Sequence, residues 1–200
     1  LQAGVSELTM ACVCIGIALH GGMLTAMGTF FVFSDYMKPA IRMAALMELP
    51  VKFVWSHDAF RVGEDGPTHE PVEQEAQIRL MEKLQNHSGR DSVRVLRPAD
   101  VNETTVCWKM AMENMDTPTA LIFSRQNVAN LPEGTDYSGA ERGAYTVVSD
   151  AQPEVVLVAS GSEVSTLVAA RQLLSTDGIT SRVVSCPSEQ LFRAQDEAYR

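Results

Sequence analysis

The chain has 200 residues, of which 46% are hydrophobic, and it carries a formal net charge of −9 at pH 7. This length suits one large domain, or one domain and part of another, and the apolar content supports a buried core. The acidic balance argues against a protein that binds nucleic acid, because phosphate binding needs clustered Lys and Arg.

The first two thirds of the chain alternate between helical and strand-like patterns. Apolar residues at helical spacing predict helices over residues 7–20 and 31–47, a helix that opens at Pro71, and another from Asp100 to about Met115. Short apolar runs predict a buried strand over residues 23–29 and further strands over 51–56, 93–96 and 119–123. Pro39 must lie near the start of its helix or kink it. The alternation predicts an α/β fold with a mostly parallel sheet sandwiched by helices.

Residues 128–153 break this rhythm, because they are rich in Gly, Ser, Asp, Glu and Pro and contain only a short strand signal. We interpret them as a linker between two domains. A strand over 155–159, a helix over 164–174 and a strand over 180–185 then predict the opening of a second, truncated α/β unit. The expected domains are therefore 1–127, which is truncated at its N-terminus, and 154–200.

Signals for disulfides, membranes and targeting are sparse. Cys12, Cys14, Cys107 and Cys186 show no spacing typical of a metal site or a disulfide, so we expect reduced structural thiols, with Cys12 and Cys14 buried in an apolar helix. No apolar run reaches the length of a membrane span, and no signal peptide is visible. These observations favour a cytoplasmic protein.

The most informative segment covers residues 55–71, between a strand pattern and a helical one. It concentrates polar and turn-forming residues: His57, Asp58, Gly63, Glu64, Asp65, Gly66, Pro67, Thr68, His69 and Pro71. Open α/β sheets place ligand sites at the carboxyl ends of their strands, where this loop would lie. A solvated structural loop is the plain alternative. A zinc site is a more specific alternative. The spacing of the two imidazoles fits no standard zinc site, however, so we expect no metal ligands here.

This segment resembles the signature of transketolases, His-Asp-Ser-Ile-Gly-x-Gly-Glu-Asp-Gly-Pro-Thr-His-Gln-Pro. Other family blocks follow in order: Gly4-Val5-Ser6-Glu7, Gly28-Thr29-Phe30, Arg97-Pro98-Ala99-Asp100, residues 121–127 and residues 159–164. The resemblance implies most of a pyrimidine-binding domain and the start of a C-terminal domain. It also implies an enzyme of the pentose phosphate pathway, which transfers a two-carbon ketol unit from a ketose phosphate to an aldose phosphate through thiamine diphosphate.

The resemblance gives roles to residues whose local patterns are ordinary. Glu7 alone would be a carboxylate at a helix start, and Phe30, Phe33 and Tyr36 a stripe facing the core. In the family, this Glu hydrogen-bonds N1′ of the cofactor's aminopyrimidine and so helps to form the reactive ylide, with the cofactor as electron sink. The three aromatic residues match the family's aminopyrimidine pocket. Glu7 is therefore expected to be both catalytic and cofactor-binding.

Four further residues match positions that contact substrate in the family. There, a His and an Asp read the ketose hydroxyls, and imidazoles supply hydrogen bonds near the reacting carbonyl and the phosphate. This implies substrate binding by His57, Asp65 and His69, with catalytic roles for the two imidazoles. Arg125 belongs to the block that holds the sugar phosphate, for which Arg is suited by its paired donors.

Some positions depart from the family pattern. Ala59 replaces a Ser that lies near the substrate phosphate, and we hypothesise that Arg61 replaces its contact electrostatically. Ser6 stands where the family usually has Arg. Residues 85–90 resemble a small polar insertion, which we expect to be a surface loop.

The chain lacks the Gly-Asp-Gly … Asn motif with which the family binds the diphosphate through Mg²⁺. In the family, the two ends of the cofactor are held by different subunits. The resemblance therefore implies a homodimer in which Mg²⁺ and the diphosphate are held by the N-terminal diphosphate-binding domain of the partner subunit. We expect this chain to be inactive by itself.

Three alternatives remain. Dihydroxyacetone synthase carries nearly the same motifs. Deoxyxylulose-phosphate synthase generally lacks the first His of the loop, so His57 disfavours it. A non-catalytic paralogue of the same fold would explain Ala59 and Ser6, but the presence of Glu7 and Arg125 counts against it.

Overall fold

The computed structural model describes residues 2–58 and 61–200. Contacts divide the chain into two compact units. Unit 1 contains the residues up to Leu96 together with Ala111–Gln126, and unit 2 contains Arg97–Met110 together with Asn127–Arg200. The division therefore falls within α4 (Val101–Glu113), which contributes to both units.

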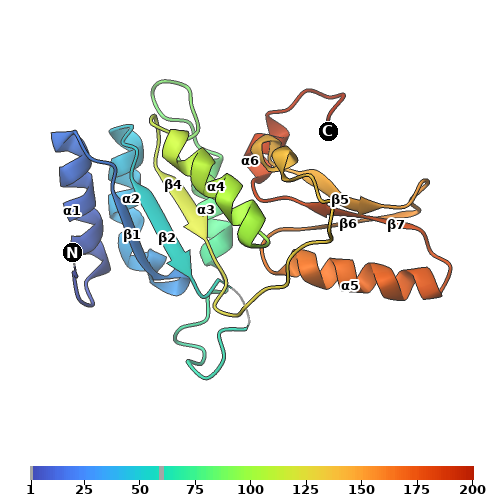
Figure 1. Cartoon of the computed structure of the whole chain (residues 1–200). Helices are drawn as coiled ribbons and strands as arrows, with labels where there is room; N and C mark the ends of the chain where they lie inside the picture. The colour runs from blue at the N-terminus through green and yellow to red at the C-terminus, as the bar shows by residue number, and fades with distance from the viewer. Residues whose placement is uncertain (1, 59–60) are drawn as a thin grey trace. The chain divides into compact units, whose positions relative to one another are not determined.

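Unit 1 is built on a parallel sheet in the order β1-β2-β4-β3. Its strands are β1 (Ala26–Phe30), β2 (Lys52–Ser56), β3 (Arg94–Leu96) and β4 (Thr119–Ile122). The other elements of this unit are α1 (Glu7–His20), the short 3₁₀ helix η1 (Phe31–Phe33), α2 (Ser34–Leu46) and α3 (Gln74–Glu82). Figure 1 shows the strands side by side with their helices, as the predicted α/β fold requires.

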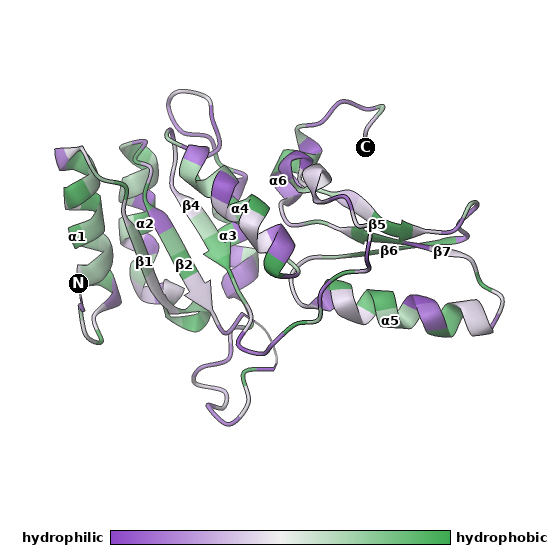
Figure 2. Cartoon of the chain, in the orientation of Figure 1, coloured by the Kyte–Doolittle hydropathy of each residue, from purple (hydrophilic) through white to green (hydrophobic). Residues whose placement is uncertain are grey.

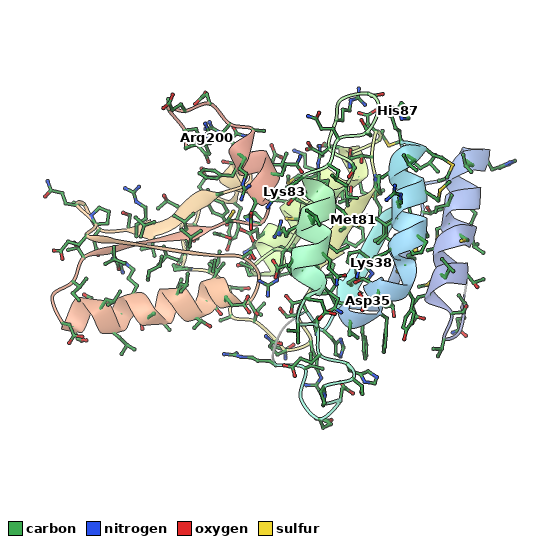
Figure 3. All side chains as sticks on the ribbon, turned by 180° about the vertical axis from the view of Figure 1, so that it is seen from behind. Asp35, Lys38, Met81, Lys83, His87 and Arg200 are labelled. Carbon is green, nitrogen blue, oxygen red and sulfur yellow. The ribbon has the colours of Figure 1, made fainter. Side chains whose placement is uncertain are left out.

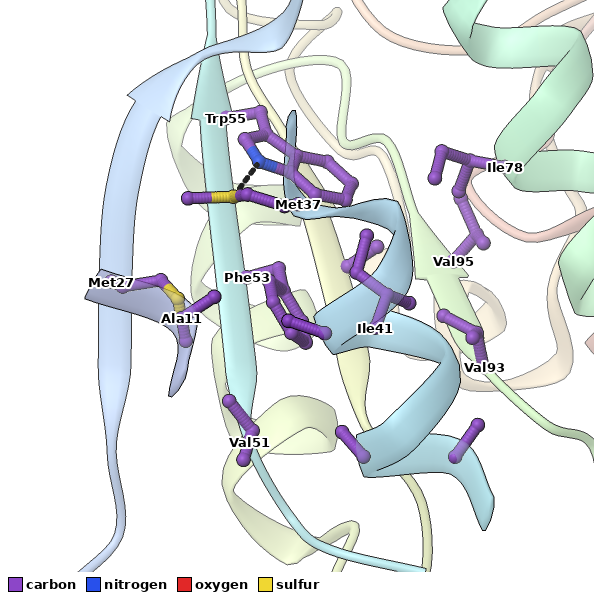
Figure 4. Close-up of a cluster of buried hydrophobic side chains, with 14 of the residues drawn as sticks. Ala11, Met27, Met37, Ile41, Val51, Phe53, Trp55, Ile78, Val93 and Val95 are labelled. Atoms are coloured by element: carbon purple, nitrogen blue, oxygen red, sulfur yellow. Dashed lines mark hydrogen bonds between the residues drawn. The ribbon is translucent and has the colours of Figure 1, made fainter. Parts of the chain in front are cut away.

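The core of unit 1 lies between one face of this sheet and its helices (Figure 4). Alternate positions of β2 point into it, so that Phe53 and Trp55 are fully buried. Ile41 and Met37 of α2 pack onto these rings, and the Trp55 Nε1 donates to the Met37 sulfur at 3.4 Å. Burial of such aromatic and branched side chains is the main favourable term in folding.

The predicted elements of unit 1 are present, with four differences. The strand predicted to be buried over residues 23–29 is β1, at the edge of the described sheet, and only Met27 is buried in it. The helix expected to open at Pro71 begins at Gln74, and the Gln74 Oε1 accepts from the backbone N–H of Val72. Pro39 lies inside α2 rather than near its start, so the other alternative, a kink in this helix, stays a prediction.

The fourth difference concerns the thiols. Cys12 is exposed on α1, although we predicted it to be buried, because α1 presents only part of its apolar surface to the core. Figure 2 shows that α1 is hydrophobic along most of its length. Cys107 is buried, and burial raises the pKa of its thiol well above the ordinary value. Among the residues that the structure describes, no helix has both the length and the hydropathy to cross a bilayer.

Unit 2 has a three-stranded sheet in the order β5-β7-β6, covered by α5 (Figure 1). Its strands are β5 (Tyr145–Ser149), β6 (Val155–Ala159) and β7 (Ser181–Ser185), and its helical segments are η2 (Tyr137–Arg142), α5 (Glu163–Thr176) and α6 (Glu189–Arg193). β6 pairs with β7 in parallel, whereas β5 pairs with β7 in the antiparallel direction. The segment that we interpreted as a linker thus contains a strand of this sheet.

The predicted cap of α4 is confirmed. The Asp100 Oδ1 accepts from the N–H of Glu103 at 2.9 Å, and the Glu103 Oε2 accepts from the N–H of Ala99 at 2.5 Å. The remaining carboxylate oxygens bind residues far along the chain, since Asp100 Oδ2 accepts from Leu131 N and Glu103 Oε1 accepts from Ser185 Oγ. The two carboxylates therefore join α4 to the rest of unit 2, and burial raises the pKa of Glu103.

A buried cation lies at the opposite end of β2 from the loop. Lys52 is fully buried, and its Nζ donates to the carbonyl of Asn114 at 2.7 Å. Burial, together with repulsion from Arg94, lowers the pKa of Lys52 from 10.5 to about 8.

We therefore expect Lys52 to make stability depend on pH between 8 and 10.5. In this window the unfolded chain binds the lysine proton more tightly, so the free energy of unfolding rises with pH, by on the order of 2 kcal/mol from this group. Denaturant unfolding at several pH values gives the free energy of unfolding of wild type and of Lys52→Met. The effect of Lys52 is the change with pH in the difference between these two free energies. A difference that stays constant across this window would contradict the prediction.

Candidate functional site

The carboxyl ends of β1, β2 and β4 lie level with one another at one edge of the unit 1 sheet. Parallel pairing places Phe30 beside Ser56 and Trp55 beside Ile122. The residues that follow each strand are therefore neighbours, although they are far apart in sequence. This edge is where open α/β sheets bind ligands.

Two imidazoles meet aromatic rings at this edge. The ring of His57 stacks on that of Phe30, with centroids 3.6 Å apart and an interplanar angle of 22°. His69 approaches Phe33 edge-on, with centroids 5.2 Å apart and planes at 78°. We call Phe30, Phe33, Tyr36, His57 and His69 the aromatic cluster.

The three aromatic side chains of this cluster come from the end of β1, the end of η1 and the first turn of α2. Phe30 and Phe33 are 6.3 Å apart and nearly parallel, and Phe33 and Tyr36 are 6.2 Å apart at 24°. Because His57 covers one face of Phe30, the ring surface left for a planar ligand is mainly that of Phe33 and Tyr36. The side chain of Tyr36 is 62% exposed.

His57 has an unusual backbone conformation. Its φ is 63°, in the left-handed region that non-glycine residues rarely adopt and that costs free energy. The ring is fixed by the stack on Phe30 and by the hydroxyl of Ser56, whose Oγ lies 3.0 Å from Nδ1. These contacts hold the imidazole at the end of β2 despite the strain.

The surroundings of His57 favour its neutral form. Burial lowers the pKa of His57 below its ordinary value, and the positive charges of Arg125 and His69 act in the same direction. The carboxylates of Asp65 and Asp58 oppose this shift without reversing it. The imidazole is therefore neutral at pH 7, with one nitrogen that can donate and one that can accept.

Arg125 follows β4, and its guanidinium lies beside the loop after His57. Gly63 has a φ of 87°, and a Cβ added to it would lie 3.5 Å from a guanidinium nitrogen of Arg125. Arg125 also lies 3.8 Å from Glu64 and keeps 40% of its side chain exposed. Farther along, His69 N donates to the carbonyl of Gly66 at 3.0 Å, which closes a turn. Ala59, the departure from the family pattern, lies outside the described residues.

Glu7 is held beside the end of β1. It is the first residue of α1 and half-buried, and its Oε1 accepts from the Thr29 hydroxyl at 3.3 Å. Thr29 precedes Phe30, so one strand end carries both the partner of the carboxylate and the first ring of the aromatic cluster. The sequence did not predict the contacts of Thr29 with Glu7 and of Ser56 with His57. A single hydroxyl residue at the end of a strand has no sequence pattern that would reveal its partner.

The predicted residues thus lie in one unit, at one sheet edge. A carboxylate beside exposed aromatic faces suits a planar, protonatable heterocycle. The neutral imidazole of His57 suits hydroxyl and carbonyl oxygens, and a half-exposed guanidinium suits a phosphate. Asp65, also at this edge, is exposed on the loop. No group of three or more His, Cys, Asp or Glu side chains that could hold a metal is found within residues 2–58 and 61–200.

Comparison with known proteins gives consistent matches along the chain. Residues 1–130 match the family described as "Transketolase, pyrimidine binding domain", and residues 143–200 match "Transketolase-like TK C-terminal domain". The chain is 49% identical to a transketolase of Halalkalibacterium halodurans and 46% identical to one of Bacillus subtilis, over 98% of its length in each case. It spans only 29% of the length of these relatives.

Solved structures agree with these matches. A transketolase from Leishmania mexicana superposes with a TM-score of 0.88 at 40% identity, covering 98% of this chain and 28% of that structure. A transketolase from Campylobacter jejuni gives a TM-score of 0.87 at 38% identity, with 100% of this chain and 30% of that structure covered.

We predict that His57 titrates below 6.5, the ordinary value for histidine. Substitution Phe30→Ala removes the stacked ring and admits water, so the midpoint should move up towards 6.5. NMR titration of the imidazole proton signals measures both midpoints. Phe33→Ala is the matched control, because Phe33 contacts His69 rather than His57. A wild-type midpoint at or above 6.5 would contradict the predicted shift.

Proposed function

The chain belongs to the transketolase family, and from this we propose that the full-length polypeptide transfers a two-carbon ketol unit from a ketose phosphate to an aldose phosphate. The observation that carries the proposal is the edge of the unit 1 sheet, where Glu7, the aromatic cluster and Arg125 lie together. These groups match the needs of a heterocyclic cofactor and of a phosphorylated sugar. The proposal includes a homodimer, as the family resemblance implies, and a location in the cytoplasm.

Thiamine diphosphate fits the residues present at this edge. It supplies, when bound, a nucleophilic carbon and an electron sink. Phe33 and Tyr36 would cover the aminopyrimidine ring, and the Glu7 carboxylate would share a proton with its N1′ atom. Thr29 keeps that carboxylate beside the strand end. We propose that the diphosphate and Mg²⁺ are held by the N-terminal domain of the partner subunit.

Substrate recognition would use the imidazoles and charges of the loop. When the Ser56 hydroxyl donates to Nδ1, the neutral ring of His57 carries its proton on Nε2 and can donate it to a sugar oxygen. The exposed carboxylate of Asp65 would accept from a ketose hydroxyl. Arg125, with His69, would bind the phosphate, for which a guanidinium offers two parallel donors.

The role of Glu7 is tested by Glu7→Gln in the full-length polypeptide, assayed with saturating cofactor. The amide keeps the size of the side chain but cannot share a proton, so kcat should fall by roughly 100-fold or more. Glu73→Gln removes an exposed carboxylate outside the site and is the matched control. If Glu7→Gln retains kcat within a few fold of wild type, the proposed cofactor role is wrong.

The role of Arg125 is tested by comparing phosphorylated and unphosphorylated ketoses as donors. In Arg125→Gln, the KM for the phosphorylated donor should rise by roughly 10–100-fold, because a charge-assisted contact to phosphate is lost. The KM for the unphosphorylated donor should change little. Arg193→Gln, at an exposed arginine paired with Glu189, is the control. An equal rise with both donors would show that Arg125 does not read the phosphate.

A further inference from the structure

A concave site lies on unit 1, between α2 and the end of α3. Its volume is about 630 Å³, within the range of pockets that bind small organic molecules. Figure 3 looks onto this side of α2 and α3, with Lys38 and Met81 labelled. We call it the α2–α3 groove. None of its lining residues belongs to the aromatic cluster.

The floor of the α2–α3 groove is apolar. Ala45 and Leu46 come from the last turn of α2, and Met81 and Leu84 come from α3 and the residues just after it. Ala45 is buried and Met81 packs against the core, whereas Leu46 is 52% exposed and Leu84 54% exposed. Two half-exposed leucines on opposite walls offer apolar surface that a ligand could cover favourably.

Cations line the α2 wall of the same groove. Lys38 and Arg42 are one helical turn apart and lie on the face of α2 that carries Leu46. Lys38 is paired with Asp35, whose other oxygen accepts from Gln74. Arg42 is exposed, and no ion pair joins it to any other residue that the structure describes. Because Lys38 is balanced by Asp35, Arg42 supplies the net positive charge of this wall.

The turn after α3 supplies most of the polar lining of the groove, and none of the lining residues is an Asp or a Glu. Gln85 and Asn86 line the groove together with Ser92, whose hydroxyl donates to the carbonyl of Met81. The nearby carboxylate of Glu48 is already bound by the N–H and hydroxyl of Ser88. An anionic head group near Arg42 would therefore meet a cation without an adjacent unpaired carboxylate.

We propose that the α2–α3 groove binds a free small-molecule anion with an apolar body and a single carboxylate or sulfonate head. The apolar body lies on Leu46, Met81 and Leu84, and the head pairs with Arg42. We infer an anionic ligand from charge complementarity, because an equally apolar cation would be repelled by the guanidinium of Arg42. The site is separate from the one proposed for the cofactor and does not depend on transketolase activity.

The test uses two probes with the same ring system in the full-length polypeptide. 8-Anilinonaphthalene-1-sulfonate carries an anionic head, and N-phenyl-1-naphthylamine is its neutral counterpart. Fluorescence titration should show that Arg42→Gln weakens binding of the sulfonate by roughly fivefold or more and leaves the neutral probe unchanged. Leu84→Glu should weaken both probes, because it removes apolar surface and adds a negative charge.

Matched controls separate this site from other apolar surfaces. Leu80→Glu and Lys83→Gln change side chains of the same region that do not line the groove, and neither should affect either probe. Decanoate should displace the sulfonate from wild type, whereas decyltrimethylammonium should not. Circular dichroism checks that each variant is folded.

The proposal is overturned if the folded protein binds no sulfonate probe, or if Arg42→Gln and Leu84→Glu both leave its affinity unchanged. In the second case the probe occupies another apolar surface. A loss of affinity with Leu84→Glu but none with Arg42→Gln would also overturn the proposal, because the sulfonate group would then make no ion pair with Arg42.

Discussion

Parallel pairing of β1, β2 and β4 is the constraint on which the candidate site depends. It sets the three strand ends level, so that residues following different strands become neighbours. The register is fixed by the core, because a slip by one residue would turn Phe53 and Trp55 away from α2. The side chains that bury apolar surface therefore also determine where Phe30, His57 and Arg125 lie.

Within this edge, His57 shows how a strained residue is held by its surroundings. A positive φ is unfavourable for a side chain with a Cβ, and such strain persists only where neighbouring contacts determine the conformation. Here the Phe30 ring and the Ser56 hydroxyl provide those contacts. The burial that results also keeps the imidazole neutral, so one set of contacts fixes its position and its protonation state.

Local patterns in the sequence predicted most elements but not their exposure. The helix over residues 7–20 was predicted with its observed bounds, because an apolar run ends at Gly21 and Gly22. The edge position of β1 and the exposure of Cys12 could not be predicted, since burial depends on neighbours that no local pattern specifies. The start of α3 was misplaced because a proline such as Pro71 is compatible with the first turn of a helix but does not require a helix to begin there.

The site residues were predicted one by one, and their roles remain predictions. What the sequence could not predict is their pairing, such as His57 on Phe30 or Thr29 with Glu7. These contacts join residues from different elements, and they arise only once the sheet has aligned its strands. The family resemblance identified the candidate residues, and the parallel strand pairing explains why they lie at one edge of the sheet.

The carboxylates of Asp100 and Glu103 have a consequence for how the two units are connected. Their partners, Leu131 and Ser185, come much later in the chain, so residues 97–110 belong to unit 2 although unit 1 resumes at Ala111. The units are thus interleaved along the polypeptide rather than arranged one after the other. A cut after residue 130, where the match to the first family domain ends, would therefore separate Asp100 from the N–H of Leu131 and Glu103 from the hydroxyl of Ser185.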